Sequence, residues 1–208
     1  MDTERIFDNA RVFENAKVSG DAQVFGNAKV FGHALVSGNA KVSGNAKVSG
    51  NAVVLGNAGV SGNAKVFGDA IIYRDALVRD NAKVSGNAHI YGHAIIYGHA
   101  IIYGNAIIYG NAQVFGEAFI NGNAMIGKDA YITKETDFMV IGPIGSRNGY
   151  TTFYLTKNKH IMVSCGCFND TIEKFTEAVQ TTHKYNKIHR ESYMDIIECA
   201  RKRLSINS

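Results

Sequence analysis

The chain has 208 residues, a net charge of +4 and 46% hydrophobic residues, which is typical of a soluble globular protein with a mild preference for anionic partners. It contains no apolar run of 18 residues and begins with a polar segment, so we expect neither a membrane span nor a signal peptide. The three cysteines are odd in number and confined to the C-terminal third, which predicts a cytoplasmic protein without a disulfide framework: Cys165, Cys167 and Cys199.

A six-residue repeat fills most of the chain. Alanine stands at every sixth position from Ala10 to Ala130, and a valine or isoleucine follows each alanine two residues later, from Val12 to Ile132. Residues two apart on a strand point to the same side, so the alanine and the aliphatic residue form an inward face. The next two positions are mostly Gly-Asn and predict a corner, because Gly adopts positive φ freely and Asn, Asp and His tolerate it. Three such sides close a coil of 18 residues, and the 21 hexads therefore predict seven coils of parallel strands about 4.8 Å apart.

The segment from Ile126 to Ile132, Ile-Gly-Lys-Asp-Ala-Tyr-Ile, resembles the hexapeptide repeat of the left-handed parallel β-helix superfamily. The resemblance implies an all-β solenoid, a left-handed parallel β-helix of about seven triangular coils, over residues 1–136. The left hand comes from the resemblance, since the usual chirality of parallel crossovers would suggest the opposite. Known members include acyltransferases, sugar-nucleotide enzymes, γ-type carbonic anhydrases and structural rods, so the resemblance by itself assigns no activity.

The N-terminal end of the predicted rod has no covering helix. Ile6 occupies the inward aliphatic position and leads directly into the first coil. Charged residues surround this end, which is a recognised way to discourage edge-to-edge growth of sheets: Asp2, Glu4, Arg5, Asp8 and Glu14.

Outward side chains 18 residues apart stack into columns, which distinguish three faces of the rod. On the basic face, phenylalanines (Phe13, Phe31 and Phe67) stand beside a column of cations over five coils: Arg11, Lys29, Lys47, Lys65 and Lys83. On the apolar face, aliphatic side chains adjoin a column of tyrosines: Leu35, Val53, Ile71, Ile107 and Met125, with Tyr73, Tyr91 and Tyr109. The third, mixed face is polar near the N-terminus and turns apolar toward the C-terminus.

The two distinctive faces have different interpretations. Lysine is a common filler of exposed strands, so the basic face is either a solvated surface or a binding site for a polyanion such as a nucleic acid. A contiguous apolar surface on a soluble rod indicates that something covers it. We therefore expect a homo-oligomer, most simply a parallel trimer as in many proteins that carry this repeat, and no membrane partner.

After Ile132 the repeat decays, and residues 137–208 predict a small α+β module made of a β-hairpin and two helices. The segment from Gly142 to Gly145, with the only proline of the chain, ends the repeat. The hairpin strands are expected at Tyr150–Thr156 and His160–Cys167. About 70 residues are marginal for independent stability, so we expect the module to dock on the apolar end of the rod.

Two helices complete the predicted module. Asp170 can cap the first, with Glu173 three residues later, and the second is expected from about Glu191 to Leu204. This segment resembles uncharacterised domains attached to such repeats in bacterial and phage proteins.

No set of residues predicts a catalytic or metal site. The resemblance to acyltransferases would imply a histidine beside a projecting loop, but His33, His93 and His99 occupy corner positions that normally hold Asn. A zinc site needs converging histidines, and four extended residues separate His89 from His93 by about 13 Å. Cys165 and Cys167 are expected on one side of a strand as small buried hydrophobic residues.

The segment from Gly142 to Arg147 could present backbone amides and a guanidinium group to an anion, although a turn that joins the two parts suits it better. The regularity of the repeat favours a non-enzymatic scaffold or binding protein that acts through self-assembly and macromolecular interaction, with no cofactor and no metal. A hexapeptide-type acyltransferase and a polyanion or nucleic-acid binder are the alternatives.

Overall fold

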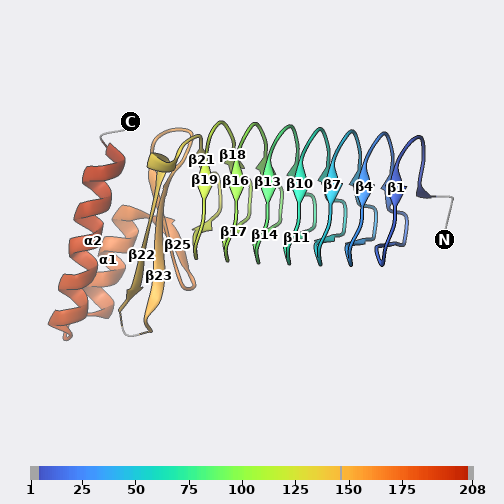
Figure 1. Cartoon of the computed structure of the whole chain (residues 1–208). Coiled ribbons are helices and arrows are strands. Elements are labelled where there is room, and N and C mark those ends of the chain that lie inside the picture. Colours follow the sequence, from blue (N-terminus) through green and yellow to red (C-terminus); the bar gives the residue numbers. More distant parts are fainter. Residues whose placement is uncertain (1–4, 146, 206–208) are drawn as a thin grey trace.

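The computed structural model describes residues 5–145 and 147–205. The chain first winds into a straight rod of seven stacked coils, and each coil adds one short parallel strand to each of three sheets (Figure 1). A four-stranded antiparallel sheet and two helices follow at the C-terminal end of the rod. The predicted seven-coil parallel solenoid and the α+β unit after it are confirmed.

Each face of the rod is the outer side of one seven-stranded sheet. The basic face is formed by β1 (Arg11–Val12), β4 (Lys29–Val30), β7 (Lys47–Val48), β10 (Lys65–Val66), β13 (Lys83–Val84), β16 (Ile101–Ile102) and β19 (Phe119–Ile120). The apolar face is formed by β2 (Lys17–Val18), β5 (Leu35–Val36), β8 (Val53–Val54), β11 (Ile71–Ile72), β14 (His89–Ile90), β17 (Ile107–Ile108) and β20 (Met125–Ile126). The mixed face is formed by β3 (Gln23–Val24), β6 (Lys41–Val42), β9 (Gly59–Val60), β12 (Leu77–Val78), β15 (Ile95–Ile96), β18 (Gln113–Val114) and β21 (Tyr131–Ile132).

The inward residues of the repeat form one continuous core. Every repeat alanine from Ala22 to Ala130, and every repeat valine or isoleucine from Val24 to Ile132, is buried. The corresponding residues of the first coil are only half-buried, because no coil lies below them. Ile6 pairs with Val24 as an isolated bridge, while Asp2 and Glu4 lie outside the described residues. The inward residues of the repeat therefore serve the stability of the rod, and they occupy equivalent positions in every coil.

The corners correct one prediction from the sequence. Positive φ occurs at the glycine position, as at Gly44 with φ 66°, and not at the following Asn or His. A side chain at Gly44 would also place its Cβ 2.9 Å from the carbonyl oxygen of Gly62 in the next coil. His33, His93 and His99 therefore occupy their corners for a reason other than backbone conformation.

Asparagine at the corners forms hydrogen-bonded ladders that run along the rod. Asn27 Nδ2 donates to Asn45 Oδ1 at 3.3 Å, and the chain of bonds continues through Asn63 to Asn81, each at 3.1 Å. The repeat thus selects Asn because its amide both donates and accepts in register with the coils above and below. Three acidic residues stand where the repeat has glycine, and each carboxylate accepts the N–H of the glycine one coil above: Asp8, Glu14 and Asp80.

The C-terminal module is more elaborate than the predicted hairpin with two helices. Its sheet has the order β22 (Phe138–Ile144), β23 (Gly149–Leu155), β24 (Ile161–Cys165), β25 (Phe168–Thr171). The predicted hairpin corresponds to β23 and β24, but β22 and β25 were missed. Pro143, which was expected to end the repeat, lies after the last coil of the rod, within β22 at the edge of the sheet, where no neighbouring strand needs its missing N–H.

The helices α1 (Ile172–Thr182) and α2 (Lys187–Ser205) cover the side of this sheet that faces away from the rod (Figure 1). The predicted cap of α1 was wrong by one residue, because Thr171 Oγ1 accepts the N–H of Lys174. Asp170 instead lies within β25, one residue before its end, and its side chain accepts the N–H of Thr171. The second helix begins four residues earlier than predicted. Neither helix of the described chain is long and apolar enough to cross a membrane.

The module docks on the end of the rod, as expected. Phe138, Tyr154 and Met162 pack against the last coils and extend the core of the rod into the sheet. The N–H of Met125, which has no further coil to pair with, donates to Thr152 Oγ1 at 3.0 Å. Since the module covers the end of the rod, the faces of the earlier coils stay uncovered by it.

Candidate functional surfaces

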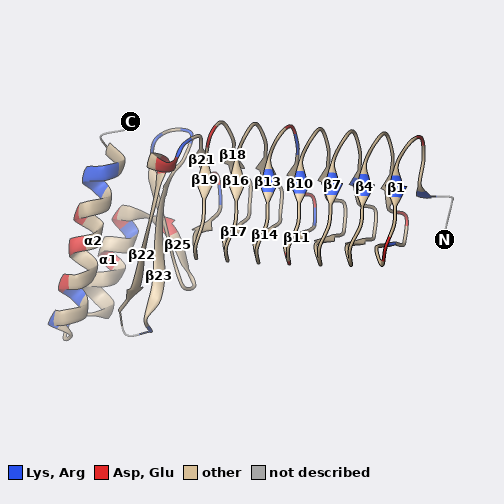
Figure 2. Cartoon of the chain, in the orientation of Figure 1, with Lys and Arg blue, Asp and Glu red and all other residues tan. Residues whose placement is uncertain are grey.

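The basic face holds its cations in direct register. Lys29, Lys47, Lys65 and Lys83 are Cα partners in successive parallel strands, with Arg11 paired to Lys29. Figure 2 shows the result as a row of blue strands, one in each of five successive coils, from β1 to β13. All five side chains are exposed, and within the described chain the four lysines form no ion pair with a carboxylate. Unit charges about 4.8 Å apart in water repel by about 0.9 kcal/mol before salt screening, so this column carries a small standing repulsion.

The phenylalanines beside the cations belong to the same face. Each stands two residues after the cation of its strand and therefore points outward with it. Phe13 and Phe31 stack with their centroids 5.1 Å apart and an interplanar angle of 6°, and the guanidinium of Arg11 lies 5.5 Å from the Phe13 centroid. Phe67 has serines above and below it in this column and is 42% exposed.

The aliphatic side chains of the apolar face are in direct register, as the cations of the basic face are. Leu35 pairs with Val53, Val53 with Ile71, and Ile107 with Met125. His89, considered from the sequence only as a zinc ligand, lies in the same column and pairs with Ile71 on one side and Ile107 on the other. All the residues named here are half-buried, so they remain partly open to an additional partner.

A column of stacked tyrosines lies beside the aliphatic column of the apolar face and runs along the rod to the module. Tyr73 and Tyr91 stack at 4.8 Å, and Tyr91 and Tyr109 stack at 5.5 Å. Burial, and then the neighbouring tyrosines, raises the pKa of Tyr91 above its usual value. The hydroxyl of Tyr109 accepts a hydrogen bond from Asn169 Nδ2 and lies 3.5 Å from Ser164 Oγ, so the ladder ends in contact with the module.

The three corner histidines of the rod do not converge on a common point. His33, His93 and His99 lie at the corners that follow β4, β14 and β15, which belong to three different faces. His93 Nδ1 lies 3.9 Å from Asp75 Oδ2, and this pair extends the Asn ladder of its corner. Residues 5–145 and 147–205 contain no group of three or more His, Cys, Asp or Glu side chains that could hold a metal ion.

A cleft of about 290 Å³ opens in the module between two hairpin turns and the end of α1. Cys165 Sγ accepts the hydroxyl of Thr151 at 3.2 Å and lies 4.0 Å from the hydroxyl of Tyr193. Cys167 is exposed in the turn that follows β24, which corrects the expectation that both thiols lie buried on one strand. Burial and the adjacent Cys165 raise the pKa of Tyr193 to about 12, so its phenol stays protonated near neutral pH. Arg147, from the proposed anion-binding segment, also lines this cleft.

Comparison with known families supports the repeat. The model of the YdcK beta solenoid repeat matches residues 100–116, which hold the strands β16, β17 and β18. The chain is therefore similar to that repeat over one coil, with one strand on each face. No curated protein and no solved structure matches the chain.

Proposed function

We propose that the protein is a non-enzymatic scaffold that assembles through its apolar face and presents its other surfaces to macromolecular partners. One observation carries this proposal. From Leu35 to Met125 the two outward columns of the apolar face contain no Asp, Glu, Lys or Arg, and the module that could have covered them sits on the end of the rod. An apolar surface of this length on a rod is typical of a protein–protein interface.

The energy available to this interface can be bounded. A fully buried aliphatic side chain is worth about 1.5–3 kcal/mol, so a half-buried one has about 1 kcal/mol left to gain. The eight apolar residues of the interface would then contribute about 8 kcal/mol per subunit, against an association cost of about 4–15 kcal/mol. A single pairwise contact is therefore marginal, and a closed ring in which each subunit has two neighbours is favoured.

A parallel trimer satisfies these requirements most simply. In a closed ring each subunit uses two different patches, one toward each neighbour. The apolar face supplies one patch, and the adjoining C-terminal half of the mixed face, which includes the exposed Leu77 and the half-buried Ile95, supplies the other. The Tyr73–Tyr109 ladder lies along the corner between these faces and would be enclosed by both. The basic face would remain on the outside.

Multi-angle light scattering tests the assembly. The full chain at micromolar concentration is expected to be oligomeric, and Ile71→Lys combined with Ile107→Lys is expected to give folded monomers or smaller particles, because the interface would bury unpaired ammonium groups. Ile101→Lys is the matched control, since Ile101 has the same half-buried environment on the basic face. A monomeric wild type, or equal loss of assembly in both variants, would contradict the proposed interface.

The acyltransferase alternative has less support. The repeat spacing holds without a projecting loop from Ala10 to Ile132, and His33, His93 and His99 lie at three separate corners. The proposal therefore assigns no catalytic residue.

A further inference from the structure

The side of the rod that the proposed assembly leaves outside carries two parallel columns with different chemistry. The first is the line of cations from Arg11 to Lys83, in register and without carboxylate partners in the described residues. It spans four strand spacings, or about 19 Å. The second column runs beside it, two residues further along each strand.

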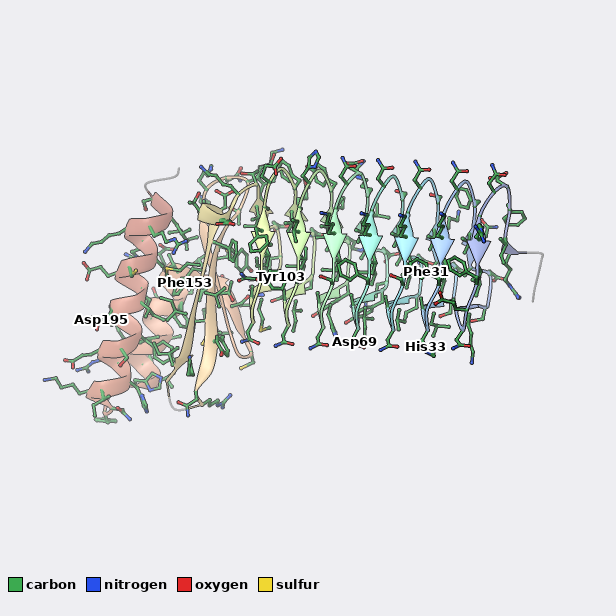
Figure 3. The ribbon with its side chains drawn as sticks, viewed as in Figure 1. Phe31, His33, Asp69, Tyr103, Phe153 and Asp195 are labelled. Carbon is green, nitrogen blue, oxygen red and sulfur yellow. The ribbon has the colours of Figure 1, made fainter. Side chains whose placement is uncertain are left out.

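The second column alternates large aromatic rings with small hydroxyl side chains. In order along the rod it reads Phe31, Ser49, Phe67, Ser85 and Tyr103. The ring planes in this column lie across the rod axis where two neighbours stack, as Phe13 and Phe31 do with an interplanar angle of 6°. Phe67 and Tyr103 are 42% and 40% exposed, which is high for aromatic side chains on a rigid sheet. Figure 3 shows Phe31 and Tyr103 along the same side of the rod.

The serines leave two gaps between rings. Across each gap, consecutive aromatic residues are two coils apart, which corresponds to about 9.6 Å. Stacked aromatic rings have centroids about 4.5–7 Å apart, so one flat ring fits in each gap and contacts an aromatic side chain on both sides. Lys47 precedes the first serine by two residues on the same strand face, and Lys83 precedes the second. Each gap is thus paired with an exposed ammonium group.

We propose that the basic face binds single-stranded nucleic acid, with phosphates along the lysine column and bases inserted beside Phe67 at Ser49 and Ser85. Single strands are the polyanions that offer both a chain of negative charge and unpaired flat rings. A duplex keeps its bases stacked inside, and an inorganic polyphosphate has no rings to place in the gaps. This site is on a different side of the rod from the proposed assembly interface and does not depend on it.

The acidic residues beside the five cations are already engaged. In the adjoining corner, Asp69 Oδ1 accepts a hydrogen bond from Asn51 Nδ2 at 2.8 Å, and Glu14 Oε2 accepts the N–H of Gly32 at 2.7 Å. Asp80, in the corner on the other side, accepts the N–H of Gly98 at 3.2 Å. Their carboxylates point toward the corners instead of neutralising the lysines.

Fluorescence anisotropy with a labelled 20-nucleotide oligothymidylate tests the proposal on the full chain. The wild type is expected to bind it more tightly than a 20-base-pair duplex or polyphosphate, with an affinity that falls as salt rises by about 0.7 log units per log unit for each phosphate contact. Lys47→Gln with Lys65→Gln is expected to weaken binding at least tenfold and to reduce the salt slope by about 1.4. Lys17→Gln with Lys41→Gln, on the other two faces, is the matched control and is expected to change affinity less than twofold.

Two further variants test the gaps themselves. Phe67→Ala is expected to weaken oligothymidylate binding about tenfold while polyphosphate binding is unchanged. Ser49→Phe with Ser85→Phe fills both gaps with a residue that the column already accommodates, and it is expected to have a similar effect without loss of the circular dichroism signal of the fold.

Several results would overturn the proposal. These are the absence of oligothymidylate binding at low salt, equal affinity for duplex or polyphosphate, and unchanged affinity in the lysine or gap variants. Light scattering of the Lys47/Lys65, Phe67 and Ser49/Ser85 variants separates this outcome from failure of the scaffold proposal, because none of these variants alters the apolar face.

Discussion

Asp137 closes the C-terminal end of the rod, and its replacement gives a direct measure of that closure. In earlier coils the N–H at the equivalent position donates to a backbone carbonyl one coil above, as Phe115 does to Ile132 at 2.9 Å. Thr133 has no coil above it, and its N–H donates to Asp137 Oδ2 at 2.8 Å instead. The same oxygen accepts the hydroxyl of Thr133 at 2.7 Å and the N–H of Lys134 at 3.1 Å. A side-chain carboxylate therefore replaces the missing eighth coil.

The expected cost of Asp137→Ala follows from these contacts. Hydrogen bonds to charged groups contribute about 1.5–3 kcal/mol each, and Asp137 is only 2% exposed, so water cannot replace it without rearrangement. The three bonds share one acceptor and Thr133 is half-buried, so we expect a total loss of about 3–5 kcal/mol. Asp137→Asn keeps an acceptor oxygen but loses the charge, and it should cost about 1–2 kcal/mol.

Urea unfolding followed by circular dichroism gives the free energy, and amide hydrogen exchange gives its location. The N–H groups of Thr133 and Lys134 are expected to exchange faster in Asp137→Ala, while those of the N-terminal coils are unaffected, because each coil contacts only its neighbours. Glu135→Ala is the control, since Glu135 is an exposed residue of the same short 3-10 helix, Glu135–Asp137. Equal stabilities of the Asp137→Ala and Glu135→Ala variants would refute the capping role.

Two further predictions concern one residue of the module, Tyr154, and one residue of the rod, His93. Burial raises the pKa of Tyr154 to about 12; because the unfolded chain releases this proton near pH 10, the associated stability is complete below pH 10 and falls by about 2–3 kcal/mol as pH rises to about 12. Tyr154→Phe should remove this loss from alkaline unfolding curves, and an unchanged pH dependence would contradict it. His93→Asn should leave stability within about 0.5 kcal/mol, because Asn can take the place of His93 beside Asp75 in the corner ladder; acetyl-CoA turnover that this change abolishes would overturn the scaffold proposal.

The rod was predictable because every coil solves the same physical problem. Ala and Val or Ile fill a narrow triangular interior, and their spacing of two residues fixes which side of the strand faces inward. Once the period is known, register follows without further information, so the columns from Lys29 to Lys83 and from Leu35 to Met125 could be written down before any coordinates. Local propensity and long-range packing agree in this segment.

The sequence predicted the positions of the corners but not the interactions that stabilise them. The sequence indicates where Gly-Asn turns occur, yet the use of Asn in ladders such as Asn27 to Asn81 depends on side chains from successive coils. The signal was present in the 18-residue spacing of the Asn residues, because polar groups stacked at one strand spacing can donate to one another. The prediction considered only whether Asn tolerates positive φ within its own coil, and it left out hydrogen bonds between coils.

The module was predictable only in part, because its strands are not repeated. β22 contains Gly142 and Pro143, which locally disfavour a strand, and it forms because it lies at a sheet edge and contributes Phe138 to the core of the rod. β25 is four residues long and runs directly into α1. Neither segment has enough periodicity to be recognised without its partners. The cap formed by Asp137 was missed for the same reason, since its value depends on the end of the rod beside it.

The functional proposals rest on the positions that the fold leaves free. Inward residues are dictated by the core and corner residues by the ladders, so only two outward columns on each face can vary without disturbing the rod. Random variation would mix charge and apolarity among the faces, whereas the cations from Arg11 to Lys83 occupy successive coils of one face and the aliphatic residues occupy another. Like charges in register oppose folding slightly and half-buried aliphatic residues leave free energy unused, so neither arrangement is explained by the stability of the single chain. Our two proposals supply a reason for each arrangement, namely a partner that lies along the rod: an anionic strand on the basic face, and further copies of the chain on the apolar face.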